Sequence, residues 1–437
     1  MKIIHTSDWH LDHSLYHRRR TEEFSAFLAW MLQTLAENNA DVLVISGDIF
    51  NTRTPSVQAQ EMYYDFLKRV RKDYVQGKSR CRHVVIVAGN HDSPAFLAAP
   101  REVLEFLEVY VITGVERNVL FLKNREETEA VLVAAVPFLP AREVTVSKDG
   151  ETAEEKSRNL NLGIRDVYHE LLAEARRVAA EFGAENVPII TTGHLFTQGG
   201  KTGDETHSSG FRELYVGSLE HFPADGFPDD FDYVALGHLH VPQRVAGREH
   251  VRYSGSPIPI DFSEAGGGKE VVLVEFLGSR RPPGGGELPK DARPASLPPG
   301  GRQLPSAPFP AAITRVPVPC FQELRRIRGG LDEIQSEIQI LKMADSEAWL
   351  EVVYDGAEYV ADLERKIAEW VKDSRLEVLG IRNRSAGRTM QGVFREDETL
   401  EHLDEENVFV RRLEQKNVLE SQHEDLLEMF REIVRSL

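Results

Sequence analysis

Five short blocks of metal-binding side chains recur along the first half of the chain. The blocks are Asp8-Trp9-His10, Gly47-Asp48, Gly89-Asn90-His91-Asp92, Gly193-His194 and Gly237-His238-Leu239-His240. They offer carboxylates, imidazoles and one amide oxygen but no thiolate, a donor set that suits Mn, Fe or Zn. Two divalent ions roughly 3.5–4 Å apart can clamp a phosphate and activate water. The residue types therefore predict a dinuclear phosphoesterase site, with ligands Asp8, His10, Asp48, Asn90, His194, His238 and His240.

Each block, taken alone, has an ordinary structural explanation. An Asp-x-His pair is common, and a His-x-His pair can lie exposed on one face of a strand. A Gly-Asn-His-Asp segment can form a turn, because Gly and Asn tolerate left-handed backbone. The five blocks together favour a metal site, because every one of them directly follows an apolar segment.

These apolar segments are predicted to be buried strands. The predicted strands are residues 2–6, 41–46, 83–88, 131–136, 188–192, 233–236, 251–254 and 271–276, with helices at 21–37 and 56–72. Apolar strands that alternate with helices indicate an α/β sandwich whose strands are covered on both faces. The strand ends gather at one edge, where sites form, and a preceding Gly lets the backbone turn sharply toward an ion.

The remaining third of the chain has a different organisation. Residues 279–312 are dominated by Pro and Gly, so we expect a linker or surface insertion between residues 1–278 and the domain that follows. Helices predicted at 324–342 and 358–372, with strands at 349–354 and 375–382, indicate a small α+β domain over 313–395.

A helical segment is predicted at 396–437. Its apolar stripe includes Leu426, Phe430 and Leu437. This stripe either packs on its own domain or docks onto a helix of a partner.

The overall composition limits the class of protein. The chain has 437 residues, 41% hydrophobic and 28% charged, which predicts two or three globular domains. We expect neither a membrane span nor a signal peptide, since no apolar run approaches about 20 residues and the N-terminus soon turns polar. The two cysteines, Cys81 and Cys320, exclude a disulfide framework and fit a reducing cytoplasm. A net charge of −18 argues against a basic DNA-wrapping protein. Any affinity for DNA is therefore expected to be local or shared with a partner.

The block sequences DWH, GDIF, GNHD, GHL and GHLH resemble the signature of calcineurin-like metallophosphoesterases. The segments TSDWHLD, AGNHDSP, ALGHLH and HVRYSGSPIPI are similar to the SbcD family of bacterial nuclease subunits. The C-terminal segments WLEVVYDGAEYVADLERKIAEW and ETLEHLDEENVFVRRL are also similar to it. The resemblance spans nearly the whole chain except the Pro/Gly-rich segment and some loops. It implies a four-layer α/β/β/α sandwich with a small α+β domain that caps the site and a helical C-terminal tail.

The resemblance also implies roles for the site residues. The implied ligand sets are Asp8, His10 and His240 for one ion and Asn90, His194 and His238 for the other, with Asp48 shared. His91 matches the catalytic histidine that steers the phosphate and protonates the leaving 3′ oxygen. Asp92 is expected to orient a histidine, and Asp12 is a weaker candidate.

One position departs from the family pattern. Archaeal relatives carry a histidine three residues after the bridging Asp, where this chain has Asn51, so no second catalytic histidine is expected. The candidate DNA contacts are Arg18, Arg19, Arg20 and Arg53, for each of which a surface ion pair is the alternative. His207, in the Gly-rich loop 198–210, is expected to be exposed.

By resemblance, the chain is an Mn²⁺-dependent DNA nuclease, with Mg²⁺, Fe²⁺ and Zn²⁺ as alternative ions. It would act as a double-strand exonuclease and as a single-strand or hairpin endonuclease in DNA repair and recombination. The implied partner is an SbcC-type coiled-coil ATPase in a 2+2 complex in the cytoplasm, at the nucleoid. The chain would dimerise through residues 56–72 and 94–108. The alternatives are another calcineurin-like phosphodiesterase or phosphatase, and a non-catalytic scaffold of the same fold.

Overall fold

In the computed structural model, the chain forms two compact units, Met1–Gln322 and Glu323–Leu437. It describes residues 1–437 except 117, 146–149, 185, 198–221, 279–308, 310, 359, 361, 385–426 and 428–437. His207, nearly all of the expected linker 279–312 and nearly all of the expected tail 396–437 therefore lie outside the described residues. None of the helices in the described parts has the length and apolar character needed to cross a membrane.

Two six-stranded sheets form the first unit. In spatial order, the first sheet contains β14 (Ala311–Pro317), β13 (Glu270–Phe276), β1 (Lys2–Thr6), β4 (Val42–Ser46), β5 (His83–Val87) and β6 (Val109–Ile112). The second contains β11 (Gln243–Val245), β12 (Arg248–Tyr253), β10 (Tyr233–Gly237), β9 (Ile189–His194), β8 (Ala130–Ala134) and β7 (Val119–Lys123). Strands β1, β4 and β5 run parallel in the first sheet, and β8, β9, β10 and β12 in the second.

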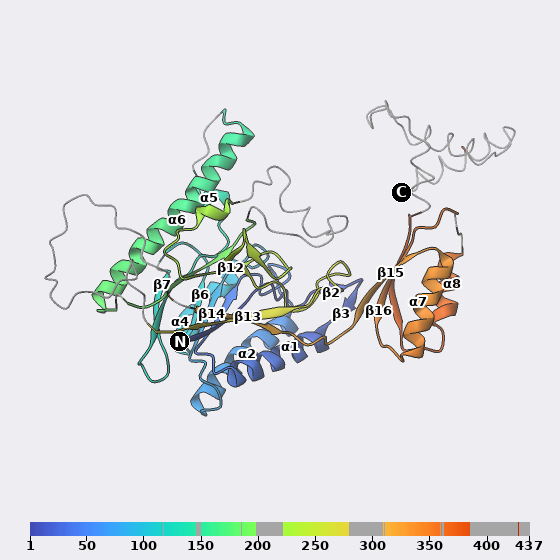
Figure 1. The fold of residues 1–437 in the computed structure, drawn as a ribbon, viewed down its shortest axis with the longest axis horizontal. Coiled ribbons are helices and arrows are strands. Elements are labelled where there is room, and N and C mark those ends of the chain that lie inside the picture. Colours follow the sequence, from blue (N-terminus) through green and yellow to red (C-terminus); the bar gives the residue numbers. More distant parts are fainter. Residues whose placement is uncertain are drawn as a thin grey trace, which may run out of the picture. The chain divides into compact units, whose positions relative to one another are not determined.

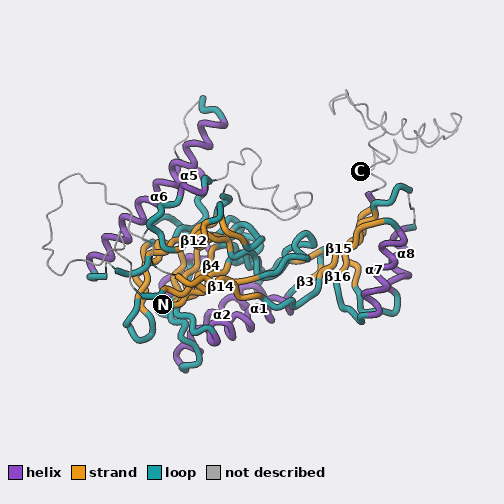
Figure 2. The backbone as a smooth tube through the Cα atoms, in the orientation of Figure 1, coloured by secondary structure: helices purple, strands orange, loops and turns teal. Residues whose placement is uncertain are grey.

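Helices cover both outer faces of the paired sheets (Figures 1 and 2). Helices α1 (Thr21–Glu37) and α2 (Val57–Val75) lie on one side, and the long α6 (Ala153–Glu181) packs on β7 and β8 on the other. Shorter elements connect these layers: β2 (Ser14–Leu15), β3 (Arg18–Arg19), α3 (Pro94–Ala98), α4 (Arg101–Glu105), α5 (Ala141–Val144) and a 3₁₀ turn at Ala224–Gly226. The predicted four-layer α/β/β/α sandwich is confirmed.

Alternation along each central strand builds the layers. On β4, Val42 and Val44 point into the core between the sheets, whereas Leu43 and Ile45 pack under α1 and α2. A strand with period 2 needs apolar residues at every position when both faces are covered, which is why this segment has no polar side. The helix ends follow local rules as well, since the Ser56 hydroxyl caps α2 by accepting a hydrogen bond from the Ala59 N–H at 3.2 Å.

The second unit contains a three-stranded parallel sheet, ordered β15 (Leu324–Gly329), β16 (Trp349–Tyr354) and β17 (Glu377–Asn383). Helices α7 (Leu331–Met343) and α8 (Leu363–Val371) share one apolar core with it. The predicted helix 324–342 is wrong in its first part. Leu324–Gly329 pairs with β16, and the glycine pair at its end separates it from α7.

The boundary between the units also differs from the prediction. Strand β14 pairs antiparallel with β13 from Glu270↔Pro317 to Phe276↔Ala311. Residues 311–317 therefore belong to the first sheet, and the expected start of the accessory domain at 313 is too early. Local sequence patterns do not indicate this pairing, because β14 is joined to its neighbour only through a long intervening segment.

Candidate metal centre

The predicted ligands lie beyond the carboxyl ends of five strands of the two sheets. β1 leads to Asp8 and His10, β4 to Asp48, and β5 to Asn90 and His91. In the second sheet, β9 ends at His194, and β10 leads to His238 and His240. The two sheets contact each other at this point, because the Ser46 hydroxyl donates to the Ala235 carbonyl at 3.0 Å. The fold therefore brings together all seven side chains that the sequence singled out.

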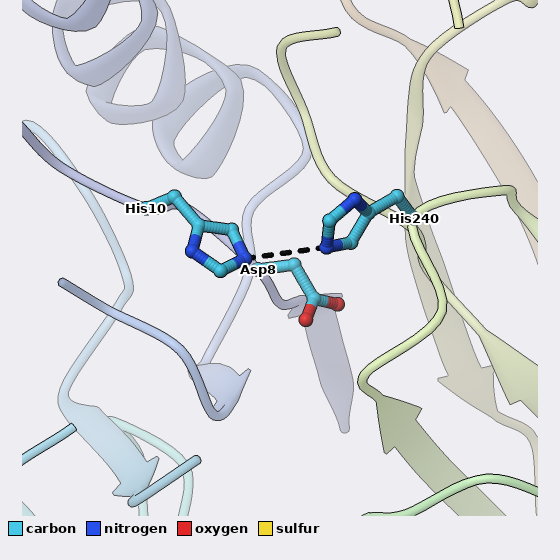
Figure 3. Close-up of side chains that lie close together, drawn as sticks. All are labelled: Asp8, His10 and His240. Atoms are coloured by element: carbon cyan, nitrogen blue, oxygen red, sulfur yellow. Dashed lines mark hydrogen bonds between the residues drawn. The ribbon is translucent and has the colours of Figure 1, made fainter. Parts of the chain in front are cut away.

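Asp8, His10 and His240 form a first group of potential ligands (Figure 3). Their donor atoms lie within 4.8 Å of one another, and the Nε2 atoms of His10 and His240 are only 3.2 Å apart. The Asp8 carboxylate accepts hydrogen bonds from the His238 N–H at 3.0 and 3.1 Å. Two imidazole nitrogens that face each other beside a carboxylate are an arrangement that one divalent cation satisfies.

Asp48, His194 and His238 form the second group, again with donor atoms within 4.8 Å. Oδ2 of Asp48 is 3.1 Å from His194 Nε2 and 3.7 Å from His10 Nε2. The Asn90 amide oxygen lies 3.0 Å from both His194 Nε2 and His238 Nδ1. Because one oxygen of Asp48 faces both groups, its geometry fits a ligand that two ions share.

Backbone carbonyls determine which ring nitrogen carries the proton in two of these histidines. Nδ1 of His194 donates to the Ser46 carbonyl at 2.9 Å, which leaves Nε2 as the ring atom that faces the second group. Nδ1 of His91 donates to the Asn51 carbonyl at 3.0 Å, and its ring centroid is 5.0 Å from that of His10. A carbonyl only accepts, so each contact selects one tautomer.

The backbone of the site is tightly built. Asp8, His10, Asp48 and His238 have φ angles of 54°, 45°, 51° and 98°. Left-handed conformations of this kind cost about 1–3 kcal/mol each, and they persist where the surrounding structure enforces them. At Gly89, a Cβ atom would lie 2.1 Å from Asp48 Oδ1, so the residue must be glycine. The strained backbone and the close contact at Gly89 thus orient these side chains toward the metal centre.

Electrostatics make the donors available to a cation. Burial lowers the pKa of His10 and lowers that of His238 to about 3, so both rings are neutral at pH 7. Burial opposes ionisation of Asp48, but His194 and His10 hold the pKa of its carboxyl well below the usual range. Burial would lower the pKa of His194, but Asp48 and Asp8 raise it to about 9. Negative charge therefore concentrates at Asp48, where a divalent cation would compete with the His194 proton.

The contacts of Asp92 differ from the prediction that this residue orients a histidine. Its buried carboxylate contacts no histidine among the described residues and instead accepts from three backbone N–H groups: Gly89 at 2.8 Å, Phe50 at 3.0 Å and Ile49 at 3.3 Å. It joins the loop after β4 to the loop after β5. Burial and the charge of Asp48 raise the pKa of Asp92 to about 7.

Arg20 does not have the exposed position that its prediction as a DNA contact requires. Its guanidinium is buried, pairs with Glu23 at 2.7 Å and donates to the Pro259 carbonyl at 2.6 Å, so it is not available to DNA. Arg18 and Arg19 form the exposed strand β3, and Arg53 is also exposed. Asp12, the weaker candidate, accepts from the Ser56 N–H at 3.2 Å next to the start of α2.

Two side chains at the site were missed by the sequence analysis. Nδ1 of His240 lies 2.9 Å from the buried carboxylate of Glu264, which no motif singles out. His13 follows the first block, and burial lowers its pKa to about 4. Its position three residues after His10 was the only available signal for His13, whereas the contact of Glu264 depends on the folding of a separate loop.

Comparisons with known proteins agree with this geometry. Residues 1–242 match the family model described as "Calcineurin-like phosphoesterase", and residues 320–417 match "Type 5 capsule protein repressor C-terminal domain". The SbcD protein of the nuclease SbcCD from Escherichia coli (strain K12) is 33% identical over 439 residues, which cover 100% of this chain and 98% of the relative.

Shorter matches carry the same name. The Rhodobacter capsulatus protein is 33% identical over 293 residues, which cover 64% of this chain and 68% of the relative. The Bacillus subtilis protein is 31% identical over 277 residues, with 63% and 66% covered. The chain therefore belongs to the calcineurin-like phosphoesterase family and, along its full length, to the SbcD family of nuclease subunits.

Proposed function

We propose that the chain is the catalytic subunit of a DNA nuclease that binds two divalent metal ions. The observation that carries this proposal is the convergence of two donor groups on Asp48: Asp8, His10 and His240 on one side, His194 and His238 on the other. In the proposed assignment each group holds one ion, Asn90 completes the second group, and Asp48 bridges. Mn²⁺ is the proposed ion, because oxygen and imidazole donors without thiolate suit it.

The chemistry follows from where the protein places its own groups. When bound, two divalent ions neutralise phosphate charge and lower the pKa of a water molecule. The Asn51 carbonyl accepts from Nδ1 of His91, so the imidazolium form of His91 would give its Nε2 proton to the leaving 3′ oxygen and return to the neutral ring that keeps its proton on Nδ1. Asn51 itself contributes through its backbone, so a histidine is not needed at that position to orient the ring.

DNA would reach this site along exposed cations near its rim. Arg18 and Arg19 lie on a short hairpin, β2–β3, that follows the first metal block, and Arg53 follows the second. We propose these three as phosphate contacts, which would supply local positive charge on an acidic chain. Such contacts weaken at high salt without changing the chemistry at the metal centre.

The proposed assembly is a dimer of this chain with two copies of a coiled-coil ATPase, a 2+2 complex that opens and trims DNA ends at the nucleoid. Full-length similarity to a protein named as one component of a nuclease supports the complex. Exposed apolar side chains support the dimer, because Val57 at the start of α2 is 70% exposed and Phe106, just after α4, is 86% exposed. The predicted C-terminal helix would dock onto the ATPase.

The test compares two substrates in Mn²⁺, with the chain alone and with its ATPase partner. One is a hairpin DNA, assayed for both exonuclease and endonuclease products, and the other is bis(p-nitrophenyl) phosphate. We expect His91→Ala to keep both ions by elemental analysis while losing about 100-fold or more of the cleavage rate, as is typical when a general acid is removed. His169→Ala, an exposed histidine on α6, is the matched control.

The outcomes separate the possibilities. Intact hairpin DNA under both conditions would exclude the nuclease function. Cleavage of the small ester alone would indicate a different phosphodiesterase. If His91→Ala lost metal and activity together, His91 would have a structural role rather than a catalytic one.

A further inference from the structure

We propose that Glu264 is a positioning residue for the metal centre, locked by Lys269 so that it fixes the ring of His240 for one of the two ions. This inference rests on the proposed metal site and extends it to two residues that no motif identifies. It concerns only the group formed by Asp8, His10 and His240.

The first step is the orientation of the imidazole. Glu264 Oε1 lies 2.9 Å from Nδ1 of His240. A carboxylate accepts, so Nδ1 carries a proton and Nε2 is the ring atom left to bind an ion. That Nε2 lies 3.2 Å from Nε2 of His10. The hydrogen bond thus sets both the tautomer and the rotation that bring His240 to the proposed ligand position.

The second step is that Glu264 is itself held in place. Its Oε2 accepts from the Lys269 ammonium, from the Ser256 hydroxyl at 3.1 Å and from the Ile260 N–H at 3.2 Å. The side chains of Glu264 and Lys269 are only 8% and 7% exposed. A buried ion pair of this kind contributes little net stability on its own, so a role in fixing geometry explains it better.

Lys269 also holds His240 from the backbone side. Its ammonium donates to the His240 carbonyl at 3.1 Å and to the Ser256 hydroxyl at 2.8 Å. His240 is therefore fixed at two points, with Glu264 on the ring and Lys269 on the main chain. The two oxygens of Glu264 have different partners. Oε1 accepts from the His240 ring, and Oε2 accepts the three hydrogen bonds from its own loop.

A cavity gives experimental access to this pair. Glu264 and Lys269 line a cavity of about 620 Å³ together with Glu270 and Arg315. The Arg315 side chain is 70% exposed, so the cavity meets solvent there. A small carboxylate such as formate could therefore enter the space that Glu264→Ala leaves and accept a hydrogen bond from Nδ1 of His240 in its place.

The experiment measures Mn²⁺ binding to the full-length chain by calorimetry and by Mn²⁺ electron paramagnetic resonance. For Glu264→Ala we expect the dissociation constant of one ion to rise by about 10–100-fold, the usual effect of removing such a partner, with the other unchanged. Added formate should recover much of the loss. Glu270→Ala is the matched control, because Glu270 lines the same cavity but pairs with Arg315 at 3.6 Å.

A double variant, Glu264→Leu with Lys269→Met, removes both charges and the acceptor at similar volume, and it should weaken binding of the same ion if the single variant does not fold. Unchanged affinity for both ions in a folded variant would overturn the inference. An equal loss of affinity for both ions without rescue by formate would also overturn it, because that result would show a general structural role for Glu264. If the unmodified chain bound no Mn²⁺, the proposed metal function itself would fail, which is a separate result.

Discussion

Replacing Asp92 by asparagine tests whether this carboxylate joins the two central loops of the metal centre. One of its oxygens accepts from the N–H groups of Gly89 and Ile49, and the other accepts from Phe50. Asparagine has a single acceptor. If that oxygen still accepts from the N–H groups of Gly89 and Ile49, the new amide NH₂ faces the N–H of Phe50, and this N–H is then buried without an acceptor.

The expected loss of stability follows from these contacts. An unsatisfied buried donor costs about 1–3 kcal/mol, so we expect a loss of about 1–3 kcal/mol at pH 6, where the metal-free carboxyl is largely protonated. Burial and Asp48 raise the pKa of Asp92 to about 7, so the wild-type chain itself loses stability as the pH rises through 7, whereas asparagine does not titrate. The difference between wild type and Asp92→Asn should therefore be smaller at pH 8 than at pH 6.

The assay is urea denaturation in EDTA at both pH values, followed by circular dichroism, together with Mn²⁺ calorimetry. Asp41→Asn is the control, because Asp41 is a buried carboxylate that precedes β4 and accepts from the Lys2 N–H at 2.8 Å, away from the metal groups. Both variants should lose stability, but only Asp92→Asn should weaken Mn²⁺ binding. Unchanged stability at pH 6, a difference that grows from pH 6 to pH 8, or equal weakening of Mn²⁺ binding by both variants would refute the reasoning.

Three further predictions follow from the structure. Gly89→Ala should abolish tight Mn²⁺ binding, because its Cβ would lie 2.1 Å from Asp48 Oδ1, whereas Gly114→Ala, with open space around it, should not; elemental analysis decides. The pKa of His194 is raised to about 9, so its stabilising contribution is complete below about 6.5 and is lost as the pH rises through 9. The urea midpoint of the metal-free chain should therefore fall over that window, and a flat profile would contradict this. Phe106→Asp should convert the proposed dimer to a monomer, and an unchanged mass in light scattering would exclude this contact.

Local information in the sequence was sufficient for the ligands and for most central strands. Each ligand directly follows an apolar segment, and the turn after a strand is a local event that Gly, Asp and Asn control. The strand predictions at 2–6 and 41–46 match β1 and β4 to within one residue, because their apolar character reflects burial on both faces. The resemblance to known nucleases carried the functional assignment further than these patterns alone.

Tertiary structure decided what depends on contacts between distant segments. Asp8 meets the His238 backbone across 230 positions, and Glu264 reaches His240 only because a separate loop folds against it. The predictions that Asp92 orients a histidine and that Arg20 contacts DNA were wrong for the same reason. Residue type states which atoms a side chain offers, but the partner that receives them is set by packing. The sequence by itself therefore determined which groups could bind metal, and the fold determined how they are oriented, protonated and held.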